Sequence, residues 1–223
     1  MMKQYVYFFL SLFLVVVFSA GCAVKTVVPP YYKGMSLSKD EIIKIQRAEV
    51  QSMKVKVDVE MERGKADYSV KGLLLVKQPK QLHLKLFNFG MLVFDMAMNN
   101  QNVSISTGTA SQVYRNLSLQ LFYSIMWWEA MEEAQMEKLK GNYIFTTPAR
   151  KLILDSDTLL PVEQRIAIMN NLFIIIYKEP AMVNGYGYPS KIIVDTGVER
   201  ITITIKTLTL NPLLEEKDFI VPL

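Results

Sequence analysis

Polar and apolar residues alternate strictly along residues 51–63, QSMKVKVDVEMER. The apolar positions fall on one face and the charged positions on the other, as in a β-strand with one face buried and one face in water. Comparable stretches fill most of the remaining chain, with Gly, Asn, Asp and Pro between them: ADYSVKGLLLVKQ, QLHLKLFNFG, MLVFDMAMNN, VSIST, QVYR, NYIFTT, KLILDS, PVEQRIAIM, LFIIIYKE, SKIIVDT and ERITITIKTLTL. We therefore predict a mainly β fold of about 11 strands in meander order. No regular alternation of strands and helices is visible, which argues against a parallel doubly wound sheet.

Two segments have a helical pattern instead. Ser38 and Glu41 form the S-x-x-E pattern of a capping box before a group of isoleucines, which predicts a helix over roughly residues 39–49. In residues 117–141, LSLQLFYSIMWWEAMEEAQMEKLKG, apolar residues recur at helical spacing up to Gly141, a typical stop signal. This second helix is predicted either to pack into the core or to lie as a plug over an open sheet. Both alternatives place it on the apolar face of the sheet.

The first thirty residues follow a different plan. Lys3 precedes an apolar run from Val6 to Phe18, and small residues then lead to Cys22, the only cysteine. This is the order of a secretory signal peptide. A transmembrane anchor is the alternative, but the run is shorter than the ~20 residues that a spanning helix needs. The segment resembles a bacterial lipoprotein signal, which implies lipidation of Cys22. A buried core thiol or a metal ligand is the other interpretation of a cysteine without a disulfide partner.

These features predict three regions. Residues 1–21 form the signal peptide, residues 22–37 form an extended, lipidated tether that contains Pro and Gly, and residues 38–223 form one domain. The lipoprotein resemblance also implies a location. The residue after the cysteine is Ala23 and not the Asp that often holds lipoproteins in the inner membrane, which favours the outer membrane, with the domain facing the periplasm.

Composition and charge give little support to catalysis or nucleic-acid binding. The net charge is +4, and basic residues do not gather in runs with interleaved aromatics. His83 is the only histidine, and its alternation with leucines predicts a place on the polar strand face. No Ser/His/Asp set and no metal-ligand cluster is indicated, so we expect no catalytic residues, no metal and no cofactor. Asp155 and Asp157 are interpreted as turn residues, and Gly185 and Gly187 do not form a dinucleotide loop.

One pair of strands has a distinctive pattern: VKGLLLVKQPKQLHLKLFNFGM, residues 70–91, in which a Gly-containing strand ends in a Lys-Gln-Pro turn. It resembles the central hairpin of the LolA/LolB family of lipoprotein carriers. Residues 172–211 resemble the family's last hairpin, and the closing KDFIVPL resembles the ending of its soluble members. The resemblance implies an α+β fold: a curved, incomplete antiparallel β-barrel with helices covering its mouth. It also implies an apolar concave face that holds the acyl chains of a lipoprotein in transit.

The residues themselves leave two interpretations of the interior open. The chain is 51% hydrophobic, contains 13 Met and has several doubled apolar stretches, which fits either a filled β-sandwich core or a cavity that adapts to guests of variable shape. The resemblance favours the cavity. The candidate lining residues are Val55, Val57, Val59, Leu74, Val76, Leu84, Leu121, Ile125, Trp128 and Ile203.

The resemblance also gives meaning to two positions. Soluble carriers have an Arg in the Lys-x-Pro turn that holds the helical lid, and this chain has Gln78, which lacks the charged fork of an arginine. A weakly held lid fits a membrane-tethered acceptor, although Gln78 alone would be interpreted as an exposed turn residue. Membrane-anchored members carry an exposed apolar residue before a loop Gly, and Phe89 and Gly90 occupy that place as a predicted membrane-insertion loop. The alternative is a phenylalanine folded back into the core.

Two functions follow as hypotheses. The first is a monomeric, outer-membrane lipoprotein that binds acyl chains and accepts or inserts lipoproteins or lipids, with a soluble periplasmic carrier as a further partner. The second is a structural or assembly lipoprotein that uses the same fold as a scaffold for protein binding. Direct transfer between two apolar cavities needs no nucleotide and avoids exposing a chain to water, which costs ~0.8 kcal/mol per CH₂ group.

Overall fold

The structure is a computed structural model that describes residues 28–63, 66–100, 102–106, 112–168 and 171–221. The first part of the chain contains α2 (Lys39–Glu49), β1 (Ser52–Arg63), β2 (Ala66–Lys77), β3 (Gln81–Asn88), β4 (Met91–Asn99), β5 (Asn102–Ile105), α3 (Gln112–Ile125) and the 3₁₀ helix η1 (Trp127–Ala130). The second part contains β6 (Gln135–Leu139), β7 (Asn142–Thr147), β8 (Arg150–Asp155), β9 (Pro161–Ile168), β10 (Asn171–Val183), β11 (Tyr186–Asp195), β12 (Arg200–Leu210) and η2 (Glu216–Phe219).

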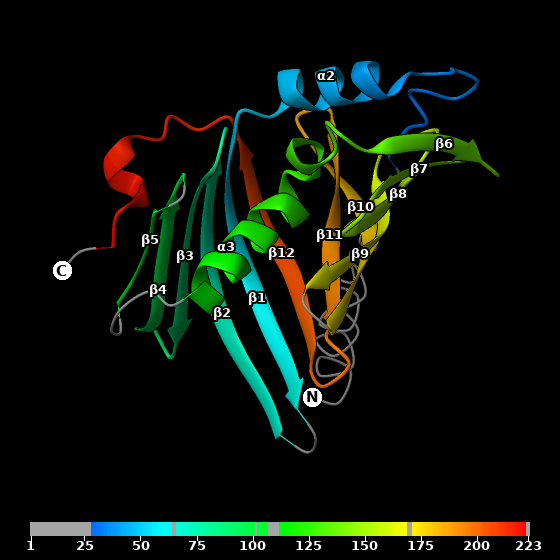
Figure 1. Cartoon of the computed structure of the whole chain (residues 1–223). Helices are drawn as coiled ribbons and strands as arrows, with labels where there is room; N and C mark the ends of the chain where they lie inside the picture. Colours follow the sequence, from blue (N-terminus) through cyan, green and yellow to red (C-terminus); the bar gives the residue numbers. More distant parts are fainter. Residues whose placement is uncertain (1–27, 64–65, 101, 107–111, 169–170, 222–223) are drawn as a thin grey trace, which may run out of the picture.

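All twelve strands belong to one antiparallel sheet in the order β5-β4-β3-β2-β1-β12-β11-β10-β9-β8-β7-β6 (Figure 1). The pairing of β1 with β12 joins the two ends of the domain in the middle of the sheet. The edge strands β5 and β6 do not pair with each other, so the sheet is open. This confirms the predicted mainly β fold with a curved, incomplete antiparallel barrel, and the sheet has one strand more than the approximate count from the sequence.

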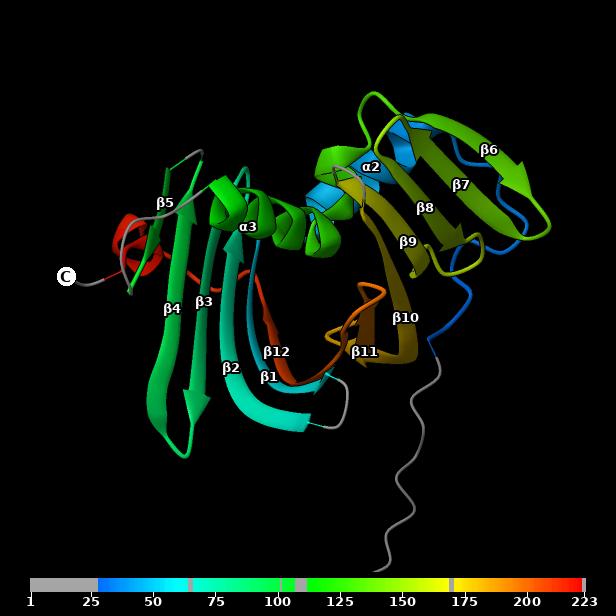
Figure 2. The same ribbon diagram turned by 60° about the horizontal axis from the view of Figure 1, so that its bottom comes forward.

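The sheet bends strongly, and α3 crosses its hollow side from one wall to the other (Figure 2). One row of paired residues explains where the bend occurs. Gly72 on β2 pairs with Val57 on β1 and with Leu86 on β3. The register of β1 against β12 shifts between Lys56 and Val57, and that of β3 against β4 shifts between Leu86 and Phe87. Bulges and a glycine at the same position along neighbouring strands allow those strands to bend together.

The predicted helix over residues 39–49 is confirmed as α2. Ser38 accepts a hydrogen bond from the backbone N–H of Glu41, and its own N–H donates to the Glu41 carboxylate. This capping box lowers the pKa of Glu41, because the hydrogen bonds from the Ser38 backbone and hydroxyl favour its ionised form. Arg47 near the other end bonds Glu129 at 2.7 Å and Glu132 at 2.5 Å, which ties α2 to the η1 segment.

The helix predicted over residues 117–141 is too long at its C-terminal end and starts too late. The prediction of residues 112–115, QVYR, as a strand is wrong, because they form the first turn of α3. The α-helix ends at Ile125, Met126 leaves helical geometry, and Trp127 and Trp128 bury their rings in the short η1 turn. Gln135–Leu139 forms β6, which pairs with β7 through a turn in which Lys140 and Gly141 both have positive φ. The backbone hydrogen bonds of this edge hairpin outweigh the helical spacing of the side chains.

Part of the predicted tether contacts the domain. Val28 is buried against the outer face of β11, where a Cβ at Gly187 would lie 2.7 Å from its side chain. The Tyr32 N–H donates to the Asp157 carbonyl, and the Leu37 N–H donates to the Tyr143 hydroxyl. Residues 28–37 of the predicted tether therefore pack against the domain at several points.

Replacing Gly72 by alanine is expected to destabilise the protein, although alanine is ordinarily tolerated better than glycine in a strand. The added Cβ would lie 2.6 Å from Cγ2 of Val57, a stiff β-branched side chain. We expect the Gly72→Ala variant to lower the free energy of unfolding by roughly 1–3 kcal/mol in chemical denaturation. In a Val57→Ala background the same change is expected to cost much less, and equal costs in the two backgrounds would contradict the steric explanation.

Candidate functional site

The apolar face of the sheet is covered at one end and uncovered at the other. The covered end carries α2, η1 and α3, and the opposite end carries the β1–β2, β3–β4 and β11–β12 turns (Figure 1). Along β1, Val55 and Val57 are only 3% and 5% exposed, whereas Val59 and Met61 are half-buried. Along β3 and β4 burial decreases in the same direction. We call these two regions the closed end and the open end.

The half-buried apolar residues at the open end lie in register across several strands. Val59 pairs with Val70 on β2 and with Ile203 on β12, and Ile203 pairs with Ile192 on β11. Because directly paired residues share a face of the sheet, this row lies on the hollow side. With its neighbours it forms what we call the open concave surface: Val59, Met61, Val70, Leu86, Phe94, Ile192, Val194, Ile201 and Ile203.

The predicted lining residues divide between the two ends. All of them belong to one apolar cluster or pack against it. The buried members are Val55, Val57, Leu74, Val76 and Trp128. The half-buried members are Val59, Leu84, Leu121, Ile125 and Ile203. The sequence thus predicted which residues share the concave face, but only the second group borders uncovered surface.

A polar cluster interrupts the apolar wall below the C-terminal half of α3. Tyr177 on β10 has its hydroxyl 2.8 Å from the Ser124 carbonyl and 3.0 Å from Oε1 of Gln164 on β9. Burial raises the pKa of Tyr177 well above its usual value, so its hydroxyl stays protonated. Gln164 is fully buried, and its Nε2 has no hydrogen-bond partner among the described residues. This leaves one end of a buried amide unpaired.

Arg150 belongs to the same cluster and is 7% exposed. Its guanidinium donates to the Tyr123 carbonyl at 3.4 Å and to Oε1 of Gln120, and it lies 5.6 Å from the centre of the Tyr123 ring. Within the described ranges, no carboxylate comes within ion-pair distance of it. Burial lowers the pKa of Arg150 to about 10, so the group is still charged at neutral pH.

The β3–β4 turn exposes apolar side chains. Asn88 pairs with Met91, which leaves Phe89 and Gly90 as a two-residue turn with φ of 48° and 81°. Phe89 is 96% exposed, so the alternative that it folds back into the core is wrong. Met91, Leu92 and Val93 beside it are also exposed.

Gln78 and His83 are both engaged with neighbouring segments. Gln78 Nε2 donates to the Val50 carbonyl at the end of α2 at 2.7 Å, so this turn does contact the helix. His83 lies on the outer face as predicted, but it is buried because η2 covers it. Its Nε2 is 2.5 Å from Asp95 and its Nδ1 is 2.5 Å from the Asp218 carbonyl.

Several other predictions concern membranes, lipidation and metals. The predicted lipidation site, Cys22, lies outside the described residues. In the part of the chain that the structure describes, the helices are too short or too polar to span a bilayer. That part also contains no group of three or more His, Cys, Asp or Glu side chains arranged to hold a metal ion. Asp155 acts as a turn residue, as predicted, and accepts bonds from the N–H groups of Asp157 and Thr158.

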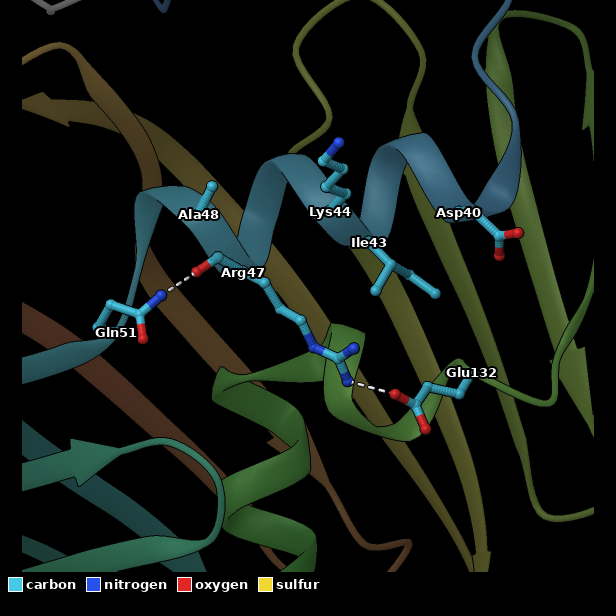
Figure 3. A pocket seen from close by; sticks show the side chains of 7 residues that line it. All are labelled: Asp40, Ile43, Lys44, Arg47, Ala48, Gln51 and Glu132. Carbon is cyan, nitrogen blue, oxygen red and sulfur yellow. Dashed lines mark hydrogen bonds and ion pairs between the residues drawn. The ribbon is translucent and has the colours of Figure 1, made fainter.

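Two surface pockets lie away from the concave surface. One of about 600 Å³ runs beside α2 and is lined by Asp40, Ile43, Lys44, Arg47, Ala48, Gln51 and Glu132 (Figure 3). Two of its charged residues, Arg47 and Glu132, already pair with each other. The other, of about 510 Å³, lies near Val28, Pro180 and Pro189. A binding hypothesis for apolar ligands therefore depends on the open concave surface and not on these pockets.

The sequence analysis missed the polar cluster, although a signal was present. Arg150 alternates with Leu152 and Leu154, and Gln164 alternates with Ile166, so both polar residues stand in line with inward-facing apolar positions. A polar residue at a position where the alternation predicts a buried apolar side chain is a candidate functional residue.

The fold resembles solved structures at low sequence identity. No family model matches the chain, and no curated protein matches it. A LolA superfamily protein from Nitrosomonas europaea aligns with a TM-score of 0.61 and 12% identity, over 83% of this chain and 99% of that chain. A DUF1329 family protein from Desulfovibrio piger aligns with a TM-score of 0.50 and 12% identity, over 81% of this chain and 95% of that chain. At these identities the likeness shows a shared LolA-like fold.

Replacing Phe89 by asparagine is expected to stabilise the protein. A turn with positive φ at both central residues prefers Asn-Gly, and an exposed phenylalanine in this conformation is unfavourable. We expect the Phe89→Asn variant to raise the free energy of unfolding by about 0.5–1 kcal/mol, measured by chemical denaturation. Leu213→Asn, at another highly exposed apolar position, is the control and should change stability by less than about 0.5 kcal/mol. A loss of stability in Phe89→Asn would mean that Phe89 packs against the domain in solution.

Proposed function

We propose that this protein is a membrane-anchored lipoprotein that binds acyl chains on its concave apolar face and accepts or inserts lipoproteins or lipids at the outer membrane. The open concave surface is the observation that carries this proposal. A sheet face with a continuous row of aliphatic side chains normally buries them, whereas the aliphatic side chains of the open concave surface remain partly exposed. An acyl chain lying along Val59, Ile203 and Ile192 would remove both its own surface and theirs from water, at ~25 cal/mol per Å².

The exposed residues around the open end support a contact with a lipid surface. Register places the turns after β1, β3 and β11 at the same end of the sheet. The side chains of Phe89, Tyr68 and Val198 near these turns are 96%, 61% and 76% exposed. We call these three residues the apolar rim. Aromatic and aliphatic side chains at projecting turns suit insertion into the headgroup region of a bilayer.

The predicted N-terminal anchor supplies the second element of the proposal. A lipidated Cys22 would hold the domain at the membrane surface, where the rim could engage the bilayer and where the open end would receive or release acyl chains. The resemblance of the N-terminal segment to a bacterial lipoprotein signal, with Ala23 after the cysteine, supports the outer membrane as the location. The LolA-like fold supports a carrier or acceptor of lipoproteins as the class of protein.

One observation favours a scaffold role as the second candidate function. At the closed end, the space between sheet and helices is filled by Phe122, Met126 and Trp128, each of which is 0% exposed. A lipoprotein that binds other proteins through its outer surface needs no open space between its sheet and its helices. The two candidates differ in whether the open concave surface takes up a hydrocarbon chain.

Acyl binding can be tested with the chain from residue 28 onward and a fluorescent fatty-acyl probe. We expect saturable binding by the parent protein and at least tenfold weaker binding by an Ile203→Trp variant, because the larger ring occupies the open concave surface. Thr204→Trp is the matched control, since Thr204 is the next residue on β12 and faces outward. No saturable binding by the folded parent protein would reject the acyl-carrier proposal and leave the scaffold.

Membrane contact can be tested by co-sedimentation of the same protein with vesicles of mixed zwitterionic and anionic phospholipids. Phe89→Ser and Val198→Ser are expected to weaken vesicle binding by at least tenfold when combined, because burial of even one large apolar side chain contributes ~1.5–3 kcal/mol. Leu213→Ser, which removes a 92% exposed leucine near the closed end, should leave binding unchanged. Equal losses in both proteins would show that the rim has no special role.

A further inference from the structure

Arg150 is a charged side chain in a setting that would normally exclude charge. It is 7% exposed, and its strand neighbours on the same face are Leu152 and the paired Ile166. A buried charge is expensive to desolvate unless a counter-ion and several hydrogen bonds compensate it. The partners seen for Arg150 are two neutral oxygens and an aromatic ring. Its charge therefore has no compensating charge among the described residues.

The surroundings of Arg150 connect it to the open concave surface. Ile166 pairs with Phe173 on β10, and both pack in a cluster with Ile192 and Val194. Ile192 and Val194 are half-buried members of the open concave surface. A chain lying on that surface would have one end within reach of the wall that carries Arg150.

A second polar group with an unpaired end lies in the same wall. Gln164 stands two residues before Ile166, which pairs with Arg150, and faces the same side of the sheet. Its Oε1 is near the Tyr177 hydroxyl, and its Nε2 has no hydrogen-bond partner in the part of the chain that the structure describes. Whichever way the amide is turned, one of its ends is unpaired, and it is fully buried. A buried cation and an unsatisfied buried amide on the same face of two paired strands indicate that a polar group belonging to another molecule completes the cluster.

The hydrogen bonds from Arg150 to α3 do not by themselves explain why a charged residue occupies this position. The Gln120 side chain and the Tyr123 carbonyl accept hydrogen bonds from Arg150, but a neutral donor would serve both without the desolvation cost of a charge. Two acceptors also leave part of the five-donor guanidinium unused. A planar group with free donors is suited to a carboxylate or a phosphate, which it can bind through two parallel hydrogen bonds.

We infer that Arg150 is the counter-ion for the anionic head group of an amphiphile whose hydrocarbon chain lies on the open concave surface. This inference rests on the proposed function and narrows the ligand to lipids with a carboxylate or a phosphate at one end. The Gln164 amide is the neighbouring polar group that faces the head group, and the aliphatic rows of β1, β11 and β12 hold the chain.

The test compares three ligands with the same acyl chain: palmitate, palmitoyl lysophosphatidate and monopalmitoylglycerol. Affinities are measured below micelle-forming concentrations at about pH 8, where the anionic ligands are ionised and Arg150 is charged. We expect the parent protein to bind at least one anionic ligand about tenfold more tightly than the neutral one. The tighter of the two anions distinguishes a carboxylate from a phosphate head group.

Arg150→Met is expected to abolish this preference while leaving the affinity for monopalmitoylglycerol within about threefold. Arg150→Lys, which keeps the charge but loses the planar fork, should retain part of the preference and guards against misfolding of the methionine variant. Arg165→Met is the matched control, because Arg165 lies on the neighbouring strand with an exposed side chain paired to Glu163, and it should change nothing.

The possible outcomes separate the two claims. Equal affinity of the parent protein for all three ligands would overturn the assignment of Arg150 and leave the acyl-binding proposal standing. A loss of affinity in Arg150→Met that is equal for neutral and anionic ligands would show that Arg150 only attaches α3 to the wall, and would also overturn it. Failure of the folded parent protein to bind any of the three would overturn the proposed function and this inference together.

Discussion

Steric contact between Gly72, Val57 and Leu86 controls how sharply the middle of the sheet can bend. Without a side chain at residue 72, the neighbours on β1 and β3 approach closely, and the register shifts beside Val57 and Leu86 let the outer strands follow. A flat sheet of this width would expose its apolar face along its whole length. The bend brings β3–β5 and β8–β10 to opposite sides of one hollow, which a single helix is long enough to cross.

The position of α3 then divides the apolar face into two halves with different properties. At the closed end, the aromatic rings of Phe122, Trp127 and Trp128 fill the space above the strands, and burial there stabilises the fold. At the open end, the apolar side chains of the same strands stay partly exposed. Their exposure costs stability, and a native protein keeps such a surface most readily where another apolar molecule covers it. This contrast within one sheet is the main support for a lipid-binding role.

The two walls of the hollow differ in chemistry. The β1–β4 wall is apolar on its concave side, and its charges lie on the outer face. The β8–β10 wall contains the buried residues Arg150, Gln164 and Tyr177, and Arg150 and Tyr177 hydrogen-bond to α3. A hollow with one apolar wall and one cationic position in the other wall suits a molecule that is itself apolar along its length and anionic at one end. The exposed rim at Phe89 and Val198 lies at the end where such a molecule would enter.

Local patterns determined much of this protein. Strict alternation predicted that Val55, Val57 and Val59 share a face, and the capping box predicted the start of α2. Both are properties of consecutive residues, because the side-chain period of a strand and the first turn of a helix need no distant partner. Only the tertiary structure decided which of the three valines stays uncovered, because coverage depends on where α3 ends and on the β6 hairpin that replaces its predicted continuation. It likewise decided that Arg150 is buried with no carboxylate beside it among the described residues. Its hydrogen-bond partners, Gln120 and Tyr123, lie on α3 and reach Arg150 on β8 only when the sheet bends around the helix.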